Sequence, residues 1–182
     1  MKPFELLQKK ELVKGHIINL YDYEYKTPAG NLVHWDVIEH KGASAIVPVD
    51  ENGNILMVRQ YRGPVDEFLL EIPAGGRDSV EEDFEICAMR ELEEETGFRT
   101  DQAHHLATYY SAAAYTNERI ELYYTDHLIP SHQNLDEDEF IQVKSYPLET
   151  LIAMIFSGEI KDGKSIAALL AYDRLIHQEE HA

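Results

Sequence analysis

Residues 76–98 read GRDSVEEDFEICAMRELEEETGF, a stretch rich in acidic residues with apolar residues between them. Its apolar residues recur at intervals of three and four, which is typical of a helix with one buried face. Ser79 can cap the first turn, Glu82 completes a capping box three residues later, and Gly97 stands where a helix commonly ends. The stretch therefore predicts a helix over residues 80–96.

The acidic residues of this helix are not all on its solvent side. At about 100° per residue, the apolar side chains form one stripe that would face a core. The stripe consists of Val80, Phe84, Cys87, Ala88 and Leu92. Glu91, Glu94 and Glu95 fall on the same side of the wheel, whereas Glu93 points away. Three carboxylates are therefore predicted to continue the core-facing stripe.

Such a cluster of carboxylates is unfavourable without a counter-charge. Like charges three or four residues apart on a helix repel by about 0.2–0.5 kcal/mol per pair, and acids in the last turn oppose the helix dipole. Arg90 is expected to neutralise one of the three acids. Oxygen ligands suit a hard cation, which predicts a site for Mg²⁺ first and Mn²⁺ second. The alternative, a solvated acidic face, is disfavoured by the core-side position; Glu82 is interpreted as the capping acid.

Composition limits the classes of function. The 182 residues include 16 Lys and Arg against 34 Asp and Glu, a formal net charge of −18. Nucleic-acid backbones and anionic membranes bind clustered cations, so neither is an expected partner. The N-terminal MKPFELLQKKELVKG lacks the apolar centre of a signal peptide. Cys87 is the single cysteine, so no internal disulfide can form, and a cytoplasmic protein is expected.

Extended segments dominate the chain on both sides of the acidic helix. Runs of β-branched and aromatic residues between turn signals predict strands at 16–25, 32–40, 44–49, 54–61, 68–73, 104–110, 118–128 and 139–146. Asn52-Gly53 predicts a hairpin between the strands at 44–49 and 54–61. Helical patterns follow at 147–157 and 163–178. This order of elements predicts an α/β (α+β) fold.

The spacing of the helix residues resembles the Nudix box. The matching positions are Gly76, Glu82, Arg90-Glu91-Leu92, Glu94-Glu95 and Gly97-Phe98. This resemblance implies an α/β/α sandwich that hydrolyses a nucleoside diphosphate linked to another moiety, with a divalent cation as cofactor.

The resemblance extends over nearly the whole chain. Val58-Arg59-Gln60-Tyr61-Arg62, followed by Glu71-Ile72-Pro73-Ala74-Gly75-Gly76, is similar to the approach to the box in the ADP-ribose pyrophosphatase subgroup. By this likeness, residues 1–42 are expected to form an antiparallel β-sheet extension that supports a homodimer. Residues 43–182 are then the Nudix hydrolase domain.

The resemblance also implies roles for individual residues of the box. Glu91 and Glu95 correspond to metal ligands, and Glu94 corresponds to a ligand of a further ion. The backbone carbonyl of Gly75 corresponds to an additional metal ligand.

Other candidates lie outside the box. Arg62 corresponds to a contact with a substrate phosphate, and Glu118 to a glutamate that lines the same pocket; without the motif, both are better interpreted as solvated. The acidic run that holds Glu137 and Glu139 resembles the loop that supplies the catalytic glutamate, and the alignment slightly favours Glu137. By itself, this run is better interpreted as a solvated loop.

Two departures from the subgroup leave the substrate open. Ala112-Ala113-Ala114 stands where Ser-Pro-Gly is usual, and Trp35-Asp36 stands where an arginine often contacts the base. Trp35 can stack on a base or pack within a dimer sheet.

The expected reaction is hydrolysis of a small nucleoside diphosphate sugar, with ADP-ribose giving AMP and ribose 5-phosphate as the best single choice. A metal-bound water would attack phosphorus, and Glu137, Glu139 or Glu94 would take its proton. The alternatives are another nucleotide sugar, a dinucleotide, or a metabolite sensor that binds without catalysis.

Overall fold

The chain divides into two compact units. The computed structural model describes residues 3–16, 18–135 and 140–179. The first unit comprises Met1–Gly42 and Tyr110–Arg119, and the second comprises Ala43–Tyr109 and Ile120–Ala182. The segment Tyr110–Arg119 joins the first unit from the middle of the sequence, which a division at residue 42 does not show.

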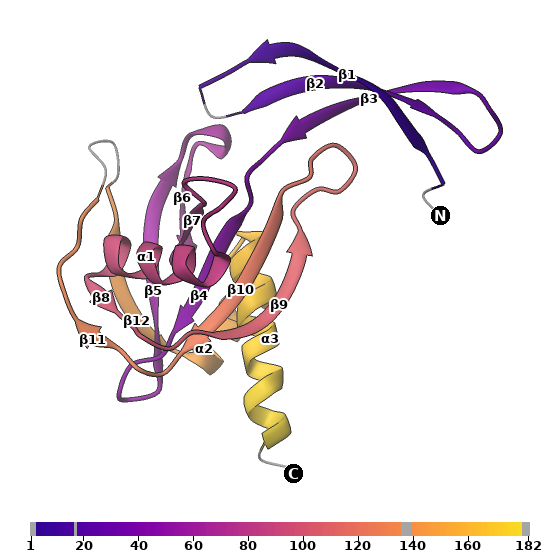
Figure 1. Cartoon of the computed structure of the whole chain (residues 1–182). Coiled ribbons are helices and arrows are strands. Elements are labelled where there is room, and N and C mark those ends of the chain that lie inside the picture. Colours follow the sequence, from indigo (N-terminus) through magenta and orange to yellow (C-terminus); the bar gives the residue numbers. More distant parts are fainter. Residues whose placement is uncertain (1–2, 17, 136–139, 180–182) are drawn as a thin grey trace. The chain divides into compact units, whose positions relative to one another are not determined.

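The first unit contains an antiparallel sheet in the order β1-β2-β3 (Figure 1). Its strands are β1 (Glu5–Lys14), β2 (Asn19–Lys26) and β3 (Leu32–Glu39). The strands predicted at 16–25 and 32–40 are confirmed, whereas β1 was missed. Every residue of β1 is exposed, so the strand has no buried face to impose an alternating pattern on its sequence.

One face of this sheet carries a row of aromatic side chains. Tyr21, Tyr23 and Tyr25 follow one another along β2, with ring centroids 6.3 and 6.1 Å apart. The indole of Trp35 lies 4.7 Å from the ring of Tyr25 and 5.3 Å from that of Phe4. The row gives the small sheet an apolar face of its own.

The segment Tyr110–Arg119 is tied to the end of β3 by backbone and side-chain bonds. The N–H of Ile38 donates to the carbonyl of Tyr115, at 2.8 Å. The N–H of His40 donates to the side-chain oxygen of Asn117, at 2.7 Å.

The second unit is built on two main sheets, with strand orders β7-β4-β10-β9 and β12-β5-β6. In the first, β4 is parallel to β10 and antiparallel to β7. The strands of this sheet are β4 (Ala43–Pro48), β7 (Ala74–Gly76), β9 (His104–Tyr110) and β10 (Arg119–Thr125). The second sheet consists of β5 (Asn54–Arg62), β6 (Glu67–Glu71) and β12 (Gln142–Pro147). A short 3-10 turn, Gly63–Val65, and a pair of short strands, β8 (Phe98–Arg99) and β11 (Ile129–Pro130), complete the set.

The hairpin predicted between 44–49 and 54–61 is wrong in its pairing. The turn forms, with Gly53 at a φ of 77° and its N–H donating to the carbonyl of Asp50. However, among the described residues the pairing beside the turn is limited to an isolated bridge between Val49, just after β4, and Ile55, and β4 and β5 then enter different sheets. Both strands are buried over most of their length, so each needs packing on both faces and the two diverge into separate layers.

The helices of the second unit cover opposite faces of the β4 sheet. They are α1 (Phe84–Thr96), α2 (Leu148–Ser157) and α3 (Gly163–Glu179). Leu92 of α1 packs with Ile46, whereas Leu169 of α3 belongs to the cluster that contains Val47. Successive residues of a strand point to opposite faces, so α1 lies on one side of β4 and α3 on the other (Figure 1). The predicted α/β/α arrangement is confirmed.

The start of α1 differs from the prediction. The helix begins at Phe84, and the side chain of Asp83 caps it by accepting from the N–H of Glu85, at 2.8 Å. Ser79 lies in the preceding turn, where its hydroxyl accepts from the N–H of Glu81, and Val80 is 65% exposed. The predicted end is confirmed, because Gly97 takes a φ of 73° and donates to the carbonyl of Glu93.

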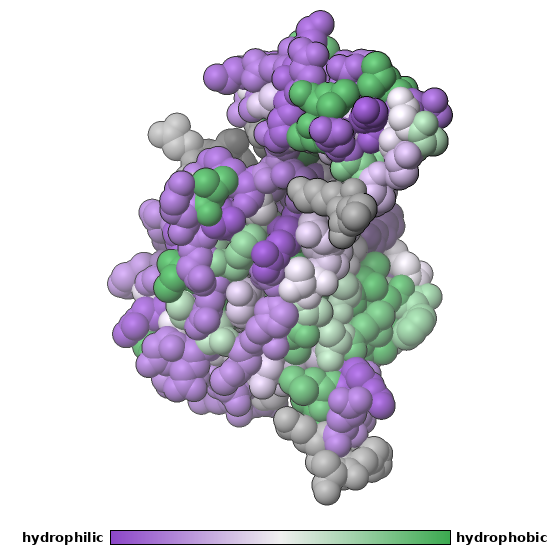
Figure 2. All heavy atoms as spheres, turned by 45° about the vertical axis from the view of Figure 1, so that its right-hand side comes forward, coloured by the Kyte–Doolittle hydropathy of each residue, from purple (hydrophilic) through white to green (hydrophobic). Residues whose placement is uncertain are grey.

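The described surface fits the acidic composition. On the face shown in Figure 2, hydrophilic residues predominate and hydrophobic residues gather in separate patches. In the part of the chain that the structure describes, no helix has the length and apolar character needed to cross a membrane.

Candidate active site

A polar pocket of about 320 Å³ lies in the second unit, where the end of β5, strand β7 and α1 meet. Strand β7 is paired with β4, directly beneath α1, and this pairing brings the backbone of Gly75 to the helix. The residues that line the pocket are Gln60, Arg62, Ala74, Gly75, Gly76, Asp78, Arg90, Glu91, Glu94, Glu95 and Asn134. The structure therefore brings Arg62 and Gly75 together with the three acids predicted on the core side of the helix.

The helical wheel correctly separated the acids of α1. Glu91, Glu94 and Glu95 all line the pocket, whereas Glu93 does not and instead accepts a hydrogen bond from the hydroxyl of Ser131, at 2.5 Å. Glu95 is 3% exposed, and one of its oxygens accepts the N–H of Ala74, at 3.0 Å. A buried carboxylate needs such a partner, and this one fixes Glu95 against β7.

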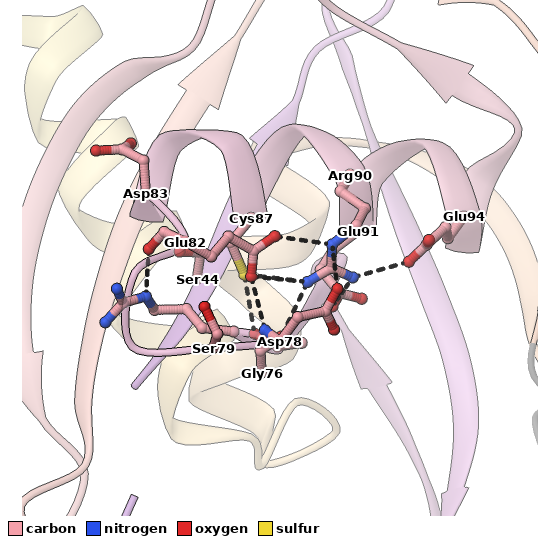
Figure 3. Close-up of polar contacts among 12 residues, drawn as sticks. Ser44, Gly76, Asp78, Ser79, Glu82, Asp83, Cys87, Arg90, Glu91 and Glu94 are labelled. Atoms are coloured by element: carbon pink, nitrogen blue, oxygen red, sulfur yellow. Dashed lines mark hydrogen bonds and ion pairs between the residues drawn. The ribbon is translucent and has the colours of Figure 1, made fainter. Parts of the chain in front are cut away.

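Arg90 neutralises more than the single acid expected of it. One of its terminal nitrogens, Nη1, donates to Glu91 at 2.7 Å and to Glu94 at 2.9 Å (Figure 3). Its Nε donates to Glu82 at 3.0 Å, and its Nη2 donates to the carbonyl of Gly76 at 3.0 Å. The guanidinium fork serves several acceptors at once because its five N–H groups lie in one plane.

The pKa of Arg90 is controlled by these contacts. Burial opposes the charged guanidinium, but the hydrogen bonds and charges of Glu82, Glu91 and Glu94 outweigh it and raise the pKa of Arg90 above its ordinary value. Arg90 is therefore a permanent cation in the middle of the acidic cluster.

Glu82 closes the loop ahead of α1 and is not a capping-box acid. Its carboxylate accepts the N–H of Asp78 at 2.7 Å and the Nε–H of Arg90 at 3.0 Å. The hydrogen bond from Arg90 is the main reason why the pKa of Glu82 is lowered. Glu82 thus holds Arg90 from the side opposite to Glu94 (Figure 3).

Gly75 is a position where a side chain does not fit. A Cβ built on Gly75 would lie 2.2 Å from the carboxylate of Glu91, far inside contact distance. The missing side chain leaves the backbone of Gly75 exposed to the acids of α1. Close approach of backbone to a ligand is a common reason for glycine at such a position.

Cys87 lies beneath the pocket and is buried, as its position on the apolar stripe predicts. Burial is the main cause that raises the pKa of its thiol to about 11, so it stays protonated at neutral pH. This residue is a small packing side chain and not a nucleophile.

The last turn of α1 is capped by the segment that follows β11. The N–H of Asn134 donates to the carbonyl of Glu94 at 2.9 Å, and the side-chain amide of Gln133 donates to the carbonyl of Glu95 at 2.6 Å. These donors satisfy the free carbonyls at the end of the helix, where acidic side chains cannot help. No local sequence pattern predicts this contact.

Arg62 reaches the pocket from the end of β5 and is held by a buried acid. Its Nε and Nη2 each donate to one oxygen of Glu71, both at 2.7 Å, and Lys164 forms an ion pair with the same carboxylate. Burial opposes ionisation of Glu71, but the hydrogen bond from Arg62 and the nearby Lys164 lower its pKa. Glu71 and Lys164 were not predicted, although an acid inside the apolar run FLLEIP is a usable signal because a buried carboxylate needs a partner.

The donors around the pocket suit a hard cation in chemistry. Glu91, Glu94 and Glu95 supply carboxylate oxygens, and the Gly75 backbone lies against one of them. Among the described residues, no three His, Cys, Asp or Glu side chains are grouped so that they could hold a metal ion as they stand. Arg90 donates to Glu91 and Glu94, and the N–H of Ala74 donates to Glu95, so protein donors already occupy oxygens of all three acids.

The remaining predicted residues belong elsewhere. Trp35 lines a hollow of about 430 Å³ within the first unit, together with Ala113 and Ala114. The carboxylate of Glu118, also in the first unit, lies 3.5 Å from Nδ1 of His40. Glu137 and Glu139 lie outside the described residues.

Comparison with known proteins agrees with this site. A family model described as NUDIX domain matches residues 39–169, so the chain belongs to the Nudix family and is a Nudix hydrolase.

Individual relatives of the chain carry the names of pyrophosphatases. The chain is 32% identical over 165 residues to an ADP-ribose pyrophosphatase of Bacillus subtilis, which covers 90% of this chain and 89% of that protein. It is 36% identical over 140 residues to a GDP-mannose pyrophosphatase of Yersinia enterocolitica, covering 70% of this chain and 71% of that protein. A crystal structure of an ADP compounds hydrolase shares the fold, with a TM-score of 0.85 at 18% identity, and covers 100% of this chain and 98% of that one.

Proposed function

We propose that the chain hydrolyses the diphosphate bond of a nucleoside diphosphate sugar, with ADP-ribose as the first candidate and AMP and ribose 5-phosphate as products. One observation carries this proposal: Glu91, Glu94 and Glu95 face a single pocket that also contains Arg62. The names of the relatives in Bacillus subtilis and Yersinia enterocolitica support the substrate class.

Mg²⁺, or alternatively Mn²⁺, is the proposed cofactor. Glu91, Glu94, Glu95 and the backbone carbonyl of Gly75 would hold it. When bound, such a cation neutralises charge on phosphate oxygens and lowers the pKa of a coordinated water.

The protein side chains have separate tasks in this proposal. Arg62 binds a phosphate of the substrate, because its guanidinium lines the pocket and is already oriented by Glu71. Arg90 keeps Glu91 and Glu94 aligned and reduces their repulsion. A glutamate takes the proton from the attacking water, and the candidates are Glu137, Glu139 and Glu94.

The first unit is proposed to bind the base and to dimerise. Trp35 is partly exposed beside a hollow and can stack on a nucleobase, and Glu118 is a further candidate for substrate contact. Residues 1–42 are proposed as a dimerising extension of a Nudix domain at 43–182, since β1 exposes its whole length and pairs only with β2 among the described strands. The proposed location is the cytoplasm, which agrees with a single, buried cysteine.

The test is a panel of ADP-ribose, GDP-mannose and a diadenosine polyphosphate with Mg²⁺, with products identified by chromatography. We expect a nucleoside monophosphate and a sugar phosphate, loss of activity with EDTA, and recovery with excess Mg²⁺. Binding of one compound without turnover of any would instead support a metabolite sensor. Preference for GDP-mannose would keep the chemistry and change the substrate.

A further inference from the structure

Glu71 is a fully buried carboxylate that joins two cations from distant parts of the chain. Arg62 approaches from the end of β5, and Lys164 approaches from the first turn of α3. The side chain of Glu71 is 0% exposed, and that of Lys164 is 14% exposed. Removing a carboxylate from water to this degree is costly, so its two cations and their geometry are needed to keep it ionised.

The pair between Arg62 and Glu71 leaves part of the guanidinium available. The carboxylate takes the N–H of Nε and one N–H of Nη2. An arginine carries five N–H groups, so both hydrogens of Nη1 and one of Nη2 remain. No acceptor for them occurs within the residues that the structure describes, and Arg62 lines the acidic pocket. These hydrogens form the edge of a guanidinium that typically binds a phosphate.

Lys164 restricts the way in which Arg62 can bind Glu71. Nη2 of Arg62 and Nζ of Lys164 share one oxygen of the carboxylate, while Nε of Arg62 holds the other. Without Lys164, the guanidinium could turn so that both terminal nitrogens face Glu71. The N–H groups that would bind a phosphate would then be used in hydrogen bonds to Glu71.

The first turn of α3 is itself fixed, so Lys164 is not a loose surface cation. Asp162 accepts from the N–H and the hydroxyl of Ser165 and pairs with Lys164 at 3.0 Å. The hydroxyl of Ser165 accepts the N–H of Ile72, next to Glu71, at 2.9 Å. Two side chains at the start of α3 thus bind the end of β6: Lys164 contacts the carboxylate of Glu71, and Ser165 contacts the backbone of the next residue.

We propose that Lys164, acting through Glu71, is a positioning residue that sets the orientation of Arg62 for binding a substrate phosphate. This inference rests on the proposed function, in which Arg62 contacts that phosphate. It assigns to the start of α3, far from the acidic helix in sequence, a part in substrate affinity.

The first experiment compares Lys164→Met with Lys161→Met on the full chain, using the best substrate of the panel. Lys161→Met is a matched control because the substitution removes the same charge, but from an exposed ion pair with Glu67. We expect Lys164→Met to raise KM about tenfold, the scale of one charge-assisted hydrogen bond, with kcat changed less than about twofold. Lys164→Arg should recover most of the affinity. An unchanged KM with a lowered melting temperature would overturn the proposal, because it would show a structural role only.

The second experiment asks whether Lys164 acts through Arg62. In an Arg62→Lys background, the guanidinium fork is absent, so Lys164→Met should raise KM no further. If the two substitutions instead multiply their effects on KM, Lys164 acts independently of Arg62 and the inference is wrong. If Lys164→Met fails to fold, Lys164→Gln takes its place in both experiments.

A binding measurement separates this inference from the proposed function. Inorganic pyrophosphate with Mg²⁺ is titrated calorimetrically into the wild type, Lys164→Met, Arg62→Lys and the double variant. If the wild type hydrolyses nothing in the panel, the proposed function fails, but similar and non-additive losses of pyrophosphate affinity would still support the positioning role. Equal affinity in all four proteins would overturn it whatever the outcome of the panel.

Discussion

Glu95 lies in the last turn of α1, with its side chain buried and one oxygen bonded to the N–H of Ala74. In Glu95→Gln, the amide oxygen can keep that bond while the charge is lost. We expect kcat to fall by about a hundredfold or more, since even outer-shell changes at metal sites cost 10–100-fold. The melting temperature should stay within a few degrees, because repulsion with Glu91 is relieved.

The control for this prediction is Glu93→Gln in the same helix. Glu93 is bonded to Ser131 and does not line the pocket, so its loss should leave kcat nearly unchanged. Equal activity of Glu95→Gln and Glu93→Gln would refute the assignment of the acidic pocket as the reaction site.

Gly75→Ala tests the close approach of strand and helix. The added methyl would meet the carboxylate of Glu91, a flexible side chain, so the backbone can stay in place while the carboxylate is displaced. We expect kcat to fall by at least about tenfold with a small change in stability. Gly76→Ala is the matched control, because nothing lies within 4 Å of the Cβ it would add. The same loss of kcat in both variants would show a backbone effect of the strand and not a clash with Glu91.

Residue by residue, the sequence predicted best what a single helix determines. The wheel placed Glu91, Glu94 and Glu95 on one side because i, i+3 and i+4 positions share a helix face. It could not predict the reach of Arg90 to Glu82 and Gly76, since a loop and a neighbouring strand supply those acceptors. Glu71 and Lys164 are 93 residues apart, a separation that no local pattern connects.

At the scale of elements, the start of α1 depends on Asp83. Asp83→Ala removes the hydrogen bond to the N–H of Glu85 and should lower the free energy of unfolding by about 1 kcal/mol. Ser79→Ala, at the position predicted from sequence as the cap, should change it by less than about 0.5 kcal/mol. Chemical denaturation of both variants measures the difference, and a larger loss for Ser79→Ala would contradict the observed helix start.

The contact between β6 and α3 should make stability depend on pH. The folded-state pKa of Glu71 is below its ordinary value of 4.5. Its contribution is therefore fully present above the ordinary value and is lost as the pH falls through the lowered one. We expect Glu71→Gln to lose about 3 kcal/mol at pH 7, and the gap to the wild type to shrink on acidification below about pH 4.

Urea unfolding of both proteins at several pH values measures that gap. Glu67→Gln is the control, because Glu67 is in the same strand and forms an exposed pair with Lys161. Its effect at pH 7 should be below about 1 kcal/mol. A gap for Glu71→Gln that grows towards low pH would show that the carboxyl is protonated in the folded state.

The positions of several strands and helices along the chain were predictable from sequence. The pairing of the strands within sheets was not. The strand at 104–110 and the helices at 147–157 and 163–178 are confirmed nearly to the residue. The Asn52-Gly53 turn also forms, but the pairing of its flanking strands is decided by the layers above and below them. Strand β1 escaped prediction for the opposite reason, since no described face of it is buried.

At the scale of the whole molecule, we expect a homodimer of two 20.9 kDa chains in solution. Strand β1 exposes Leu7 and Val13 on a sheet edge, and such an edge is a natural place for another chain. Light scattering after size exclusion measures the mass, and Val13→Lys should shift the protein towards the monomer. A monomeric wild type at micromolar concentration would remove the support for this interface.

The acidic character of the chain also matters at this scale. A net charge of −18 opposes the approach of a diphosphate. The fold compensates for this charge locally, because Arg62 and Arg90 line the same pocket. Composition makes nucleic acid an unexpected partner, but it could not show this local arrangement. The sequence therefore predicted that the chain's negative charge would repel a diphosphate. The packing of β5 against α1 brings Arg62 and Arg90 together as the compensating cations.

The division of the chain into two units has a consequence for inheritance and engineering. The backbone crosses between the units after residues 42, 109 and 119. A gene shortened to begin at residue 43 would keep Tyr110–Arg119 but lose Ile38 and His40, to which that segment bonds. Because the first unit consists of two separate segments of the sequence, a single recombination event cannot add or remove it as a whole. Exchange between homologous genes would need recombination at all three of these boundaries, so the segments at 1–42 and 110–119 should be inherited together.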